Sequence, residues 1–150
     1  MQTRYVVDTN IMTAWLLNPE GASAKIIRSR ELELFTPIKA IDELWEHRAE
    51  WSKKRVDVRL SEFTSAIGFH IRVLRVNQNS KEMKTALQIM EKIDPDDSEF
   101  LAAALRVDAE IWSRDKHFTK QSKVGVVTTE ELVKRAVDHP GLWLALHGED

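Results

Sequence analysis

Four acidic residues occupy positions in the sequence from which their carboxylates could act together. Asp8 comes directly after an apolar run at residues 5–7, and Asp115 follows a later run of the same kind. Asp97 lies at the start of a predicted helix, and Glu43 lies in the first turns of another. Carboxylates that converge within a few ångströms repel one another unless a cation lies between them. Because oxygen ligands select hard divalent cations, this set indicates a site for Mg²⁺ or Mn²⁺.

A divalent cation held by carboxylates can support the hydrolysis of phosphodiesters. It lowers the pKa of a bound water, orients that water for in-line attack and neutralises charge on the leaving oxygen. Each acid also has an ordinary structural alternative, because Asp8 can form an Asx turn, Asp97 can cap a helix and Asp115 can start a turn. Glu43 falls on the polar face of its predicted helix, so only its nearness to the helix start favours a site.

The elements that must position these acids alternate between strands and helices. Runs rich in β-branched and aromatic residues predict five strands, at residues 5–7, 32–35, 70–76, 109–112 and 124–127. Helical spacing of apolar residues predicts helices at residues 11–17, 22–29, 37–49, 53–67, 83–90, 98–107 and 130–137. Ser80 and Thr128 stand where helix caps are expected. Alternation of this kind predicts a three-layer α/β/α sandwich around a parallel sheet, and ligands bind such sheets beyond the carboxyl ends of the strands.

Composition restricts the classes of protein that remain. The chain has 150 residues, 22 Lys and Arg against 24 Asp and Glu, a net charge of -2 and no cysteine. This length predicts a single domain over residues 1–150. The absence of cysteine excludes disulfide scaffolds and thiolate metal sites. Since the charge is nearly balanced, any binding of nucleic acid must come from a local arrangement of charge.

No segment of the sequence has the character of a membrane span or a secretory signal. The longest uninterrupted apolar run covers residues 100–105, whereas a span needs roughly 18 residues. Arg4 and Asp8 bracket the early apolar run, and no cleavage region follows it. We therefore expect a soluble protein of the cytoplasm.

Other catalytic scaffolds of similar topology lack their signatures here. A phosphatase of the haloacid-dehalogenase type needs a second aspartate two positions after the first, where this chain has Asn10. There is no glycine-rich turn after the first predicted strand and no P-loop. Among the tryptophans, Trp15, Trp45 and Trp112 lie in apolar patterns that favour core packing over the stacking of bases.

Four segments of the chain, in order and at similar spacing, resemble PIN-domain proteins. They are residues 6–10 (VVDTN), residues 42–44 (DEL) after Thr36-Pro37, residues 94–105 (DPDDSEFLAAAL) and residues 111–118 (IWSRDKHF). The resemblance covers about residues 4–137. Within the family, the chain is similar to the stand-alone VapC-type toxins. The resemblance implies the same three-layer fold that the pattern of strands and helices predicts.

The resemblance implies a metal-dependent ribonuclease, commonly a homodimer, in which four acids hold Mg²⁺ or Mn²⁺. By position in the motifs these are Asp8, Glu43, Asp97 and Asp115. It implies that Asp97 rather than Asp96 is the acid of its segment, because of its spacing to the alanine-rich run. Many small members are toxins that pair with an antitoxin protein, and others process RNA. Both roles stay open.

Three further points follow from the sequence. His117 stands where many members carry another acid, which leaves the number of metal ions open. Arg114, Lys116 and His117 flank Asp115 and could offset the repulsion between the acids and a phosphate. The tail at residues 138–150 is predicted to be less regular, and its apolar residues near Trp143 favour a homodimer. The alternative to a nuclease is a catalytically inactive PIN-like module that binds RNA or protein.

Overall fold

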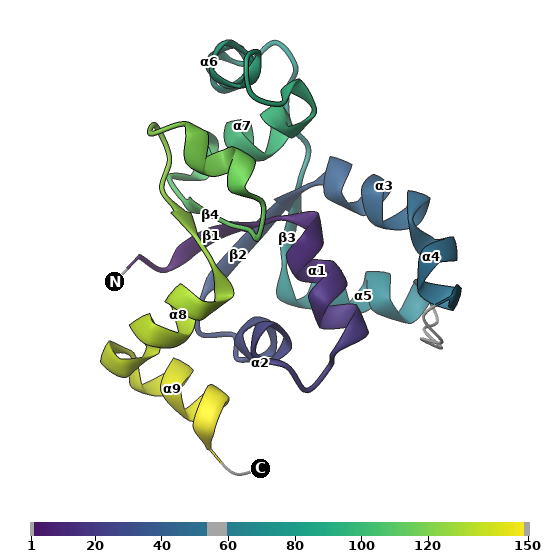
Figure 1. Ribbon diagram of the computed structural model, residues 1–150, viewed down its shortest axis with the longest axis vertical. Helices are drawn as coiled ribbons and strands as arrows, with labels where there is room; N and C mark the ends of the chain where they lie inside the picture. The colour runs from purple at the N-terminus through teal and green to yellow at the C-terminus, as the bar shows by residue number, and fades with distance from the viewer. Residues whose placement is uncertain (1, 54–59, 149–150) are drawn as a thin grey trace.

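One sheet of five parallel strands organises the computed structural model, which describes residues 2–53 and 60–148. The strands are β1 (Arg4–Val7), β2 (Glu33–Pro37), β3 (Arg72–Leu74), β4 (Glu110–Trp112) and β5 (Val126–Val127), in the order β3-β2-β1-β4-β5. Figure 1 shows α6 (Lys81–Met90) and α7 (Ser98–Val107) on one side of the sheet, and α1 (Thr9–Leu17), α2 (Ala22–Arg28) and α5 (Leu60–His70) on the other. The predicted three-layer α/β/α sandwich is confirmed.

The remaining elements are short and connect or flank the layers. They are α3 (Ile38–Glu46), α4 (Arg48–Lys53), α8 (Thr129–Arg135), α9 (Pro140–His147) and the 3-10 turns η1 (Pro95–Asp97), η2 (Lys116–Lys120) and η3 (Ala136–Asp138). Both predicted caps form: the Ser80 hydroxyl accepts from the Met83 amide, and the Thr128 hydroxyl accepts from the Glu131 amide. None of the described helices is both long enough and apolar enough to cross a membrane.

The strand β1 lies at the centre of the sheet because its side chains can be buried on both faces. Tyr5, Val6 and Val7 have no exposed surface. Val6 pairs with Phe35 of β2 on one side and with Ile111 of β4 on the other. A continuous apolar run is expected for a parallel strand that is covered by helices on both faces. The residue that follows β1 therefore emerges in the middle of the carboxyl edge.

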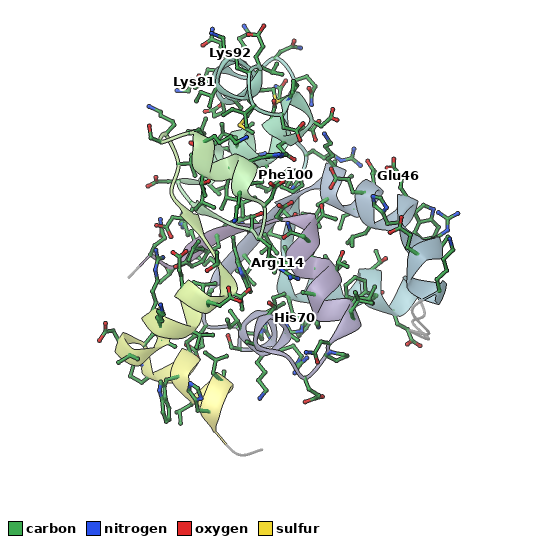
Figure 2. All side chains as sticks on the ribbon, viewed as in Figure 1. Glu46, His70, Lys81, Lys92, Phe100 and Arg114 are labelled. Atoms are coloured by element: carbon green, nitrogen blue, oxygen red, sulfur yellow. The ribbon has the colours of Figure 1, made fainter. Side chains whose placement is uncertain are left out.

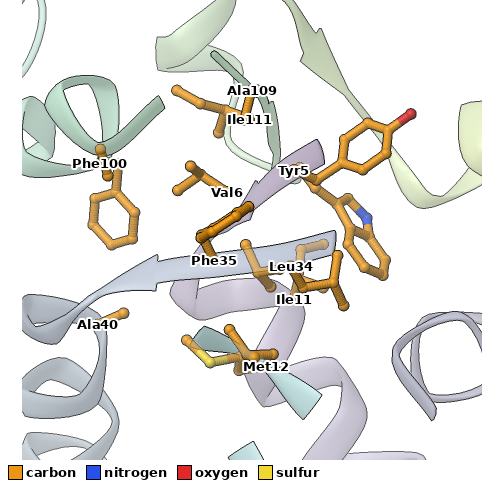
Figure 3. Packing of buried hydrophobic residues seen from close by; sticks show 14 of the residues in the cluster. Tyr5, Val6, Ile11, Met12, Leu34, Phe35, Ala40, Phe100, Ala109 and Ile111 are labelled. Carbon is orange, nitrogen blue, oxygen red and sulfur yellow. The ribbon is translucent and has the colours of Figure 1, made fainter. Parts of the chain in front are cut away.

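The core holds α1 and α7 against opposite faces of this central strand. Figure 3 shows Val6 and Phe35 between Phe100 of α7 and Met12 of α1. Phe100 is fully buried and meets Phe118 edge to face, with ring centroids 6.1 Å apart. The small side chains at residues 102–104, exposed by 1% at most, let α7 lie close to the sheet. The starts of α1 and α7 are thereby fixed at the same edge.

The predicted strand at residues 70–76 is too long. His70 instead ends α5, and β3 covers only Arg72–Leu74. The Ile71 amide donates to the Ile67 carbonyl at 2.7 Å, so the helical hydrogen bonding continues to the residue before β3. The predicted helix at residues 53–67 lies partly outside the described residues, which resume at the start of α5.

The tail is more regular than its sequence suggests. Residues 140–147 form α9, in which Pro140 occupies the first turn and the His139 ring accepts from the Leu142 amide. Leu142 and Leu146 are buried, and α9 packs against α2. The prediction of an irregular tail was wrong because a helix of this length buries only one narrow stripe, which gives a weak periodic signal.

The helix predicted at residues 37–49 is divided at His47 into α3 and α4. Trp45, on the last turn of α3, is 52% exposed, and the guanidinium of Arg48 lies 4.8 Å from its ring centroid. The prediction that Trp45 belongs to the core was therefore wrong. By contrast, Trp15 and Trp112 are buried as predicted.

Candidate active site

A cleft of about 320 Å³ lies at the carboxyl edge of the sheet, and all four predicted acids line it. Asp8 follows β1, Glu43 comes from α3, Asp97 ends η1 before α7, and Asp115 follows β4. They come together because parallel strands end at one edge. The structure thus places these carboxylates in one cavity, while their roles in metal binding and catalysis remain predictions.

Asp8 is held by its neighbours at the end of β1. Its amide donates to the Trp112 carbonyl at 2.9 Å, which continues the ladder of the sheet by one residue. Its carboxylate caps α1 by accepting from the Thr9 amide at 2.7 Å, and it also accepts from the side chain of Asn10 at 3.2 Å. With only 5% of its surface exposed, Asp8 has a fixed orientation. Its side chain is therefore both a helix cap and a wall of the cleft.

Ser113 joins two of the acids and was missed by the sequence reasoning. Its hydroxyl donates to Oδ2 of Asp8 at 2.6 Å and accepts from the Asp115 amide at 2.8 Å. The same segment is tied to α1, because the Arg114 amide donates to the Asn10 side chain at 3.2 Å. The available signal was a small polar residue directly after a buried strand and two positions before an acid.

Glu43 is connected to the start of α1 through Thr9. The Thr9 hydroxyl donates to Oε2 of Glu43 at 2.6 Å, which turns this carboxylate toward the cleft. A second link runs from α3 to the segment before α7, where the Lys39 ammonium donates to the Asp96 carbonyl. Asp96 itself is exposed and does not line the cleft, whereas Asp97 does. The geometry supports Asp97 over Asp96 as the acid of this segment.

Asp94 and His117 extend the acidic cluster beyond the four predicted residues. Nδ1 of His117 lies 3.4 Å from Oδ1 of Asp115, 3.5 Å from Oδ2 of Asp94 and 4.0 Å from Oδ2 of Asp97. Asp94, Asp97 and His117 offer ligand atoms that all lie within 4.8 Å of one another. Oδ2 of Asp97 is buried and has no hydrogen-bond partner in the part of the chain that the structure describes. These donors suit a hard or borderline divalent cation.

Burial and mutual repulsion disfavour the charged forms of two of these acids. Burial raises the pKa of Asp8 to about 6, and the charges of Glu43 and Asp115 add to the rise, while the hydrogen bonds from Ser113 and Thr9 oppose it. Burial likewise raises the pKa of Asp97 to about 7, with further contributions from the neighbouring acids. Without a cation, the ionised carboxylates of this site are unfavourable. A bound cation would stabilise them.

The metal-free protein is expected to become less stable as the pH rises from about 4 to about 7. A carboxyl whose folded pKa is raised stabilises the protein while it is protonated, and this contribution is lost as the pH passes through about 6 for Asp8 and about 7 for Asp97. The slope is at most about 1.4 kcal/mol per pH unit for each group. Urea unfolding in EDTA at a series of pH values measures it.

His70 acts in the opposite direction, because burial and the charges of Arg30 and Arg28 lower its pKa. The comparison that isolates the carboxyl is therefore the difference between the parent protein and Asp97→Asn. That difference should grow with pH in EDTA and shrink when Mn²⁺ is added. A difference independent of pH would contradict the assignment.

Comparisons with known proteins agree with this architecture. A search of curated protein sequences found no match. Among solved structures, the chain is similar to the crystal structure of VapBC2 from Rickettsia felis bound to a DNA fragment from their promoter, with a TM-score of 0.56 and 9% sequence identity over 83% of this chain and 98% of that chain. At this identity the likeness concerns the fold. The family model for the PIN domain matches residues 6–136. PIN domains are generally nucleases, and the match spans most of this chain, including all the acids of the cleft; the protein therefore belongs to the PIN-domain family.

Proposed function

We propose that this protein is a metal-dependent endoribonuclease whose active site is the acidic cleft. The observation that carries the proposal is the convergence of Asp8, Glu43, Asp97 and Asp115 in one cavity, together with a buried oxygen of Asp97 that has no partner among the described residues. Four carboxylates in one cavity are unfavourable without a cation. A bound Mg²⁺ or Mn²⁺ would lower the pKa of a water and neutralise charge on the phosphodiester.

The residues of the cleft would have two roles: some would bind the cation, and others would orient the carboxylates or the attacking water. Asp8, Asp97 and Asp115 would hold the cation, directly or through water, because they surround the space at the end of β1 and β4. Glu43 would complete this shell or orient the attacking water, with its carboxylate held by Thr9. Ser113 keeps Asp8 and Asp115 at a fixed separation by bonding to both.

The test is the cleavage of single-stranded RNA in Mn²⁺ or Mg²⁺ by the parent, Asp8→Asn and Asp97→Asn proteins. Asp96→Asn is the matched control, because Asp96 is adjacent in sequence but exposed and outside the cleft. Parallel reactions with DNA of the same sequence test whether the protein prefers RNA to DNA as its substrate. Equal cleavage by all four proteins would overturn the assignment, as would a lack of thermal stabilisation by millimolar metal, which favours an inactive binding module.

His117 is expected to influence which metal is preferred. Its Nδ1 lies between the carboxylates of Asp94 and Asp115, where a nitrogen ligand disfavours Mg²⁺ relative to Mn²⁺. Replacement of His117 by aspartate should therefore lower the ratio of Mn²⁺ to Mg²⁺ affinity by about tenfold. Thermal shifts measured at matched concentrations of the two ions give this ratio. An unchanged ratio would mean that the imidazole is not a ligand.

A protein partner and a second copy are further parts of the proposal. The similarity in fold to VapBC2 and the resemblance to VapC-type toxins support an antitoxin partner. Membership of the PIN-domain family supports a place in the cytoplasm. A homodimer is supported by apolar side chains on η3 and α9, where Val137 is 74% exposed, Leu144 is 62% exposed and Trp143 is 44% exposed. Light scattering at micromolar concentration should give a dimer mass, and Leu144→Asp should shift it toward the monomer. A monomeric parent protein would contradict this expectation.

A further inference from the structure

A second and larger pocket, of about 640 Å³, lies at the opposite edge of the sheet from the acidic cleft. Glu33 and Arg72, the first residues of β2 and β3, line it, so it opens at the amino ends of these strands. His70 at the end of α5 also lines it, and Figure 2 shows this residue on the side of the sheet that carries α2. The volume falls within the roughly 300–1,000 Å³ typical of small-molecule sites.

The charges around this pocket favour an anion. Arg30 and Arg72 line it, and neither forms an ion pair with any described residue. The one acid among the described lining residues, Glu33, is paired with Arg4 at 2.7 Å. Burial, and then the charges of Arg30 and Arg28, lower the pKa of His70. Arg28 therefore adds a further positive charge near the pocket. Unpaired guanidinium groups present the planar set of donors that matches a phosphate.

Aromatic rings stand beside both guanidinium groups. The Cζ atom of Arg30 lies 4.6 Å from the ring centroid of Phe69, and that of Arg72 lies 5.9 Å from the ring centroid of Phe35. Phe69 is 64% exposed, and its ring meets His70 edge to face at 4.9 Å. An exposed ring next to unpaired arginines is the combination that binds a base by stacking and its phosphate by charge.

Arg30 lies just past the end of α2, and its backbone conformation sets the direction of its side chain. Arg30 has a φ of 59°, in the left-handed region that residues with a side chain rarely adopt. A single residue in this conformation commonly ends a helix, and Arg30 directly follows Ser29, the C-cap of α2. In this chain it coincides with the placement of the guanidinium over Phe69 at the rim of the pocket.

We propose that this basic pocket, lined by Arg30, Phe69, His70 and Arg72, binds a phosphorylated nucleoside, with the phosphate on the arginines and the base against Phe69. The ligand can be a free mononucleotide or the phosphorylated end of an RNA strand, because both present the same group. The site lies apart from the acidic cleft and does not depend on the nuclease activity of that cleft.

The test is calorimetric titration of the full chain in EDTA with AMP, adenosine or inorganic phosphate. AMP should bind saturably, and adenosine and phosphate should each bind at least about tenfold more weakly, since each lacks one part of the recognised group. The ring resonances of His70 should shift on addition of AMP. No saturable binding of AMP at millimolar concentration, or an unshifted His70, would overturn the proposal.

Two variants separate the two halves of the ligand. Arg72→Gln should weaken both AMP and phosphate by about tenfold or more, whereas Phe69→Leu should weaken AMP by about tenfold and leave phosphate unchanged. Arg75→Gln is the matched control, because Arg75 is exposed and does not line the pocket. Unfolding midpoints confirm that each variant is folded. An equal effect of Arg75→Gln and Arg72→Gln would overturn the proposal.

The source of the ligand and its independence from the cleft are tested in the Asp8→Asn protein. AMP should bind this variant as it binds the parent, even if the nuclease assignment fails. Competition by a 5′-phosphorylated oligoribonucleotide, but not by its unphosphorylated form, identifies an RNA end as a ligand. Binding of AMP without such competition identifies a free nucleotide. Equal competition by both oligonucleotides would contradict recognition of the phosphate.

Discussion

Replacement of Asp97 by asparagine is expected to remove most of the RNA cleavage while raising the melting temperature of the metal-free protein at pH 8. The carboxylate of Asp97 contributes a buried oxygen without a partner among the described residues, and burial holds its pKa at about 7. Above that pH its charge adds to the charges of Asp94 and Asp8. An amide has nearly the same shape and no charge, so the repulsion is relieved when no cation is present.

The two effects have opposite signs, which makes them informative together. Cleavage should fall by at least about 100-fold, since even partners outside the ligand shell of a metal cost about 10–100-fold when removed. The melting temperature in EDTA should rise by a few degrees, as 1 kcal/mol corresponds to about 2–4 °C in a domain of this size. Added Mn²⁺ should stabilise the parent far more than the variant.

Scanning calorimetry in EDTA and in Mn²⁺, with a cleavage assay on the same samples, measures both effects. Asp96→Asn should change neither quantity, because the Asp96 side chain lies outside the cleft. A variant at Asp97 that is inactive but also less stable in EDTA would point to a structural role for this carboxylate instead.

Replacement of Trp112 by alanine is expected to have the largest effect on stability, a loss of about 3–5 kcal/mol in the free energy of unfolding. Trp112 has no exposed surface and is among the largest side chains of the core. Its ring nitrogen donates to the hydroxyl of Thr129 at 3.0 Å, so the substitution also removes a buried hydrogen bond. Since domains have roughly 5–15 kcal/mol of stability, this is a large part of the total.

Urea unfolding at pH 7 measures this loss, and Trp45→Ala serves as its control. Trp45 has the same side chain but is 52% exposed, so its replacement should change the free energy of unfolding by only about 0.5 kcal/mol. The backbone carbonyl at residue 112 accepts from the Asp8 amide, so repacking of β4 around the lost side chain should displace Asp8 and weaken the binding of Mn²⁺. Similar losses for the two variants would contradict the burial of Trp112.

The central strands were predictable because their composition leaves little choice. Tyr5, Val6 and Val7 form an apolar run that can be buried on both faces, and such a run requires helices on both sides. The outer strand β3 was predicted at the wrong length, since residues 70–76 carry apolar side chains that suit either the end of a helix or a strand. Hydrogen bonding from Ile71 to Ile67 decides between them, and that bond depends on the packing of α5.

The acids of the cleft were predictable from position, but the contacts that orient them were not. Asp8 directly follows the central strand β1, and Asp115 lies three residues past the end of its neighbour β4, so chain order alone brings them to one edge. The hydroxyl of Ser113 and the carboxylate of Asp94 carry no comparable signal, because serine and aspartate are frequent in turns for ordinary reasons. Their place in the cluster depends on where the segments after β4 and before α7 meet.

The alternation of strands and helices along the chain and the four predicted acids at the carboxyl edge follow from local apolar patterns and from the direction of the chain. The tertiary structure decided the distances among Asp94, Asp97, Asp115 and His117, the exposure of Trp45 and the formation of α9. The pocket at the other edge also depends on the tertiary structure, because Arg30 follows α2 whereas Phe69 belongs to α5. Such features depend on side chains that are distant in sequence and meet only when the layers pack, which no local pattern records.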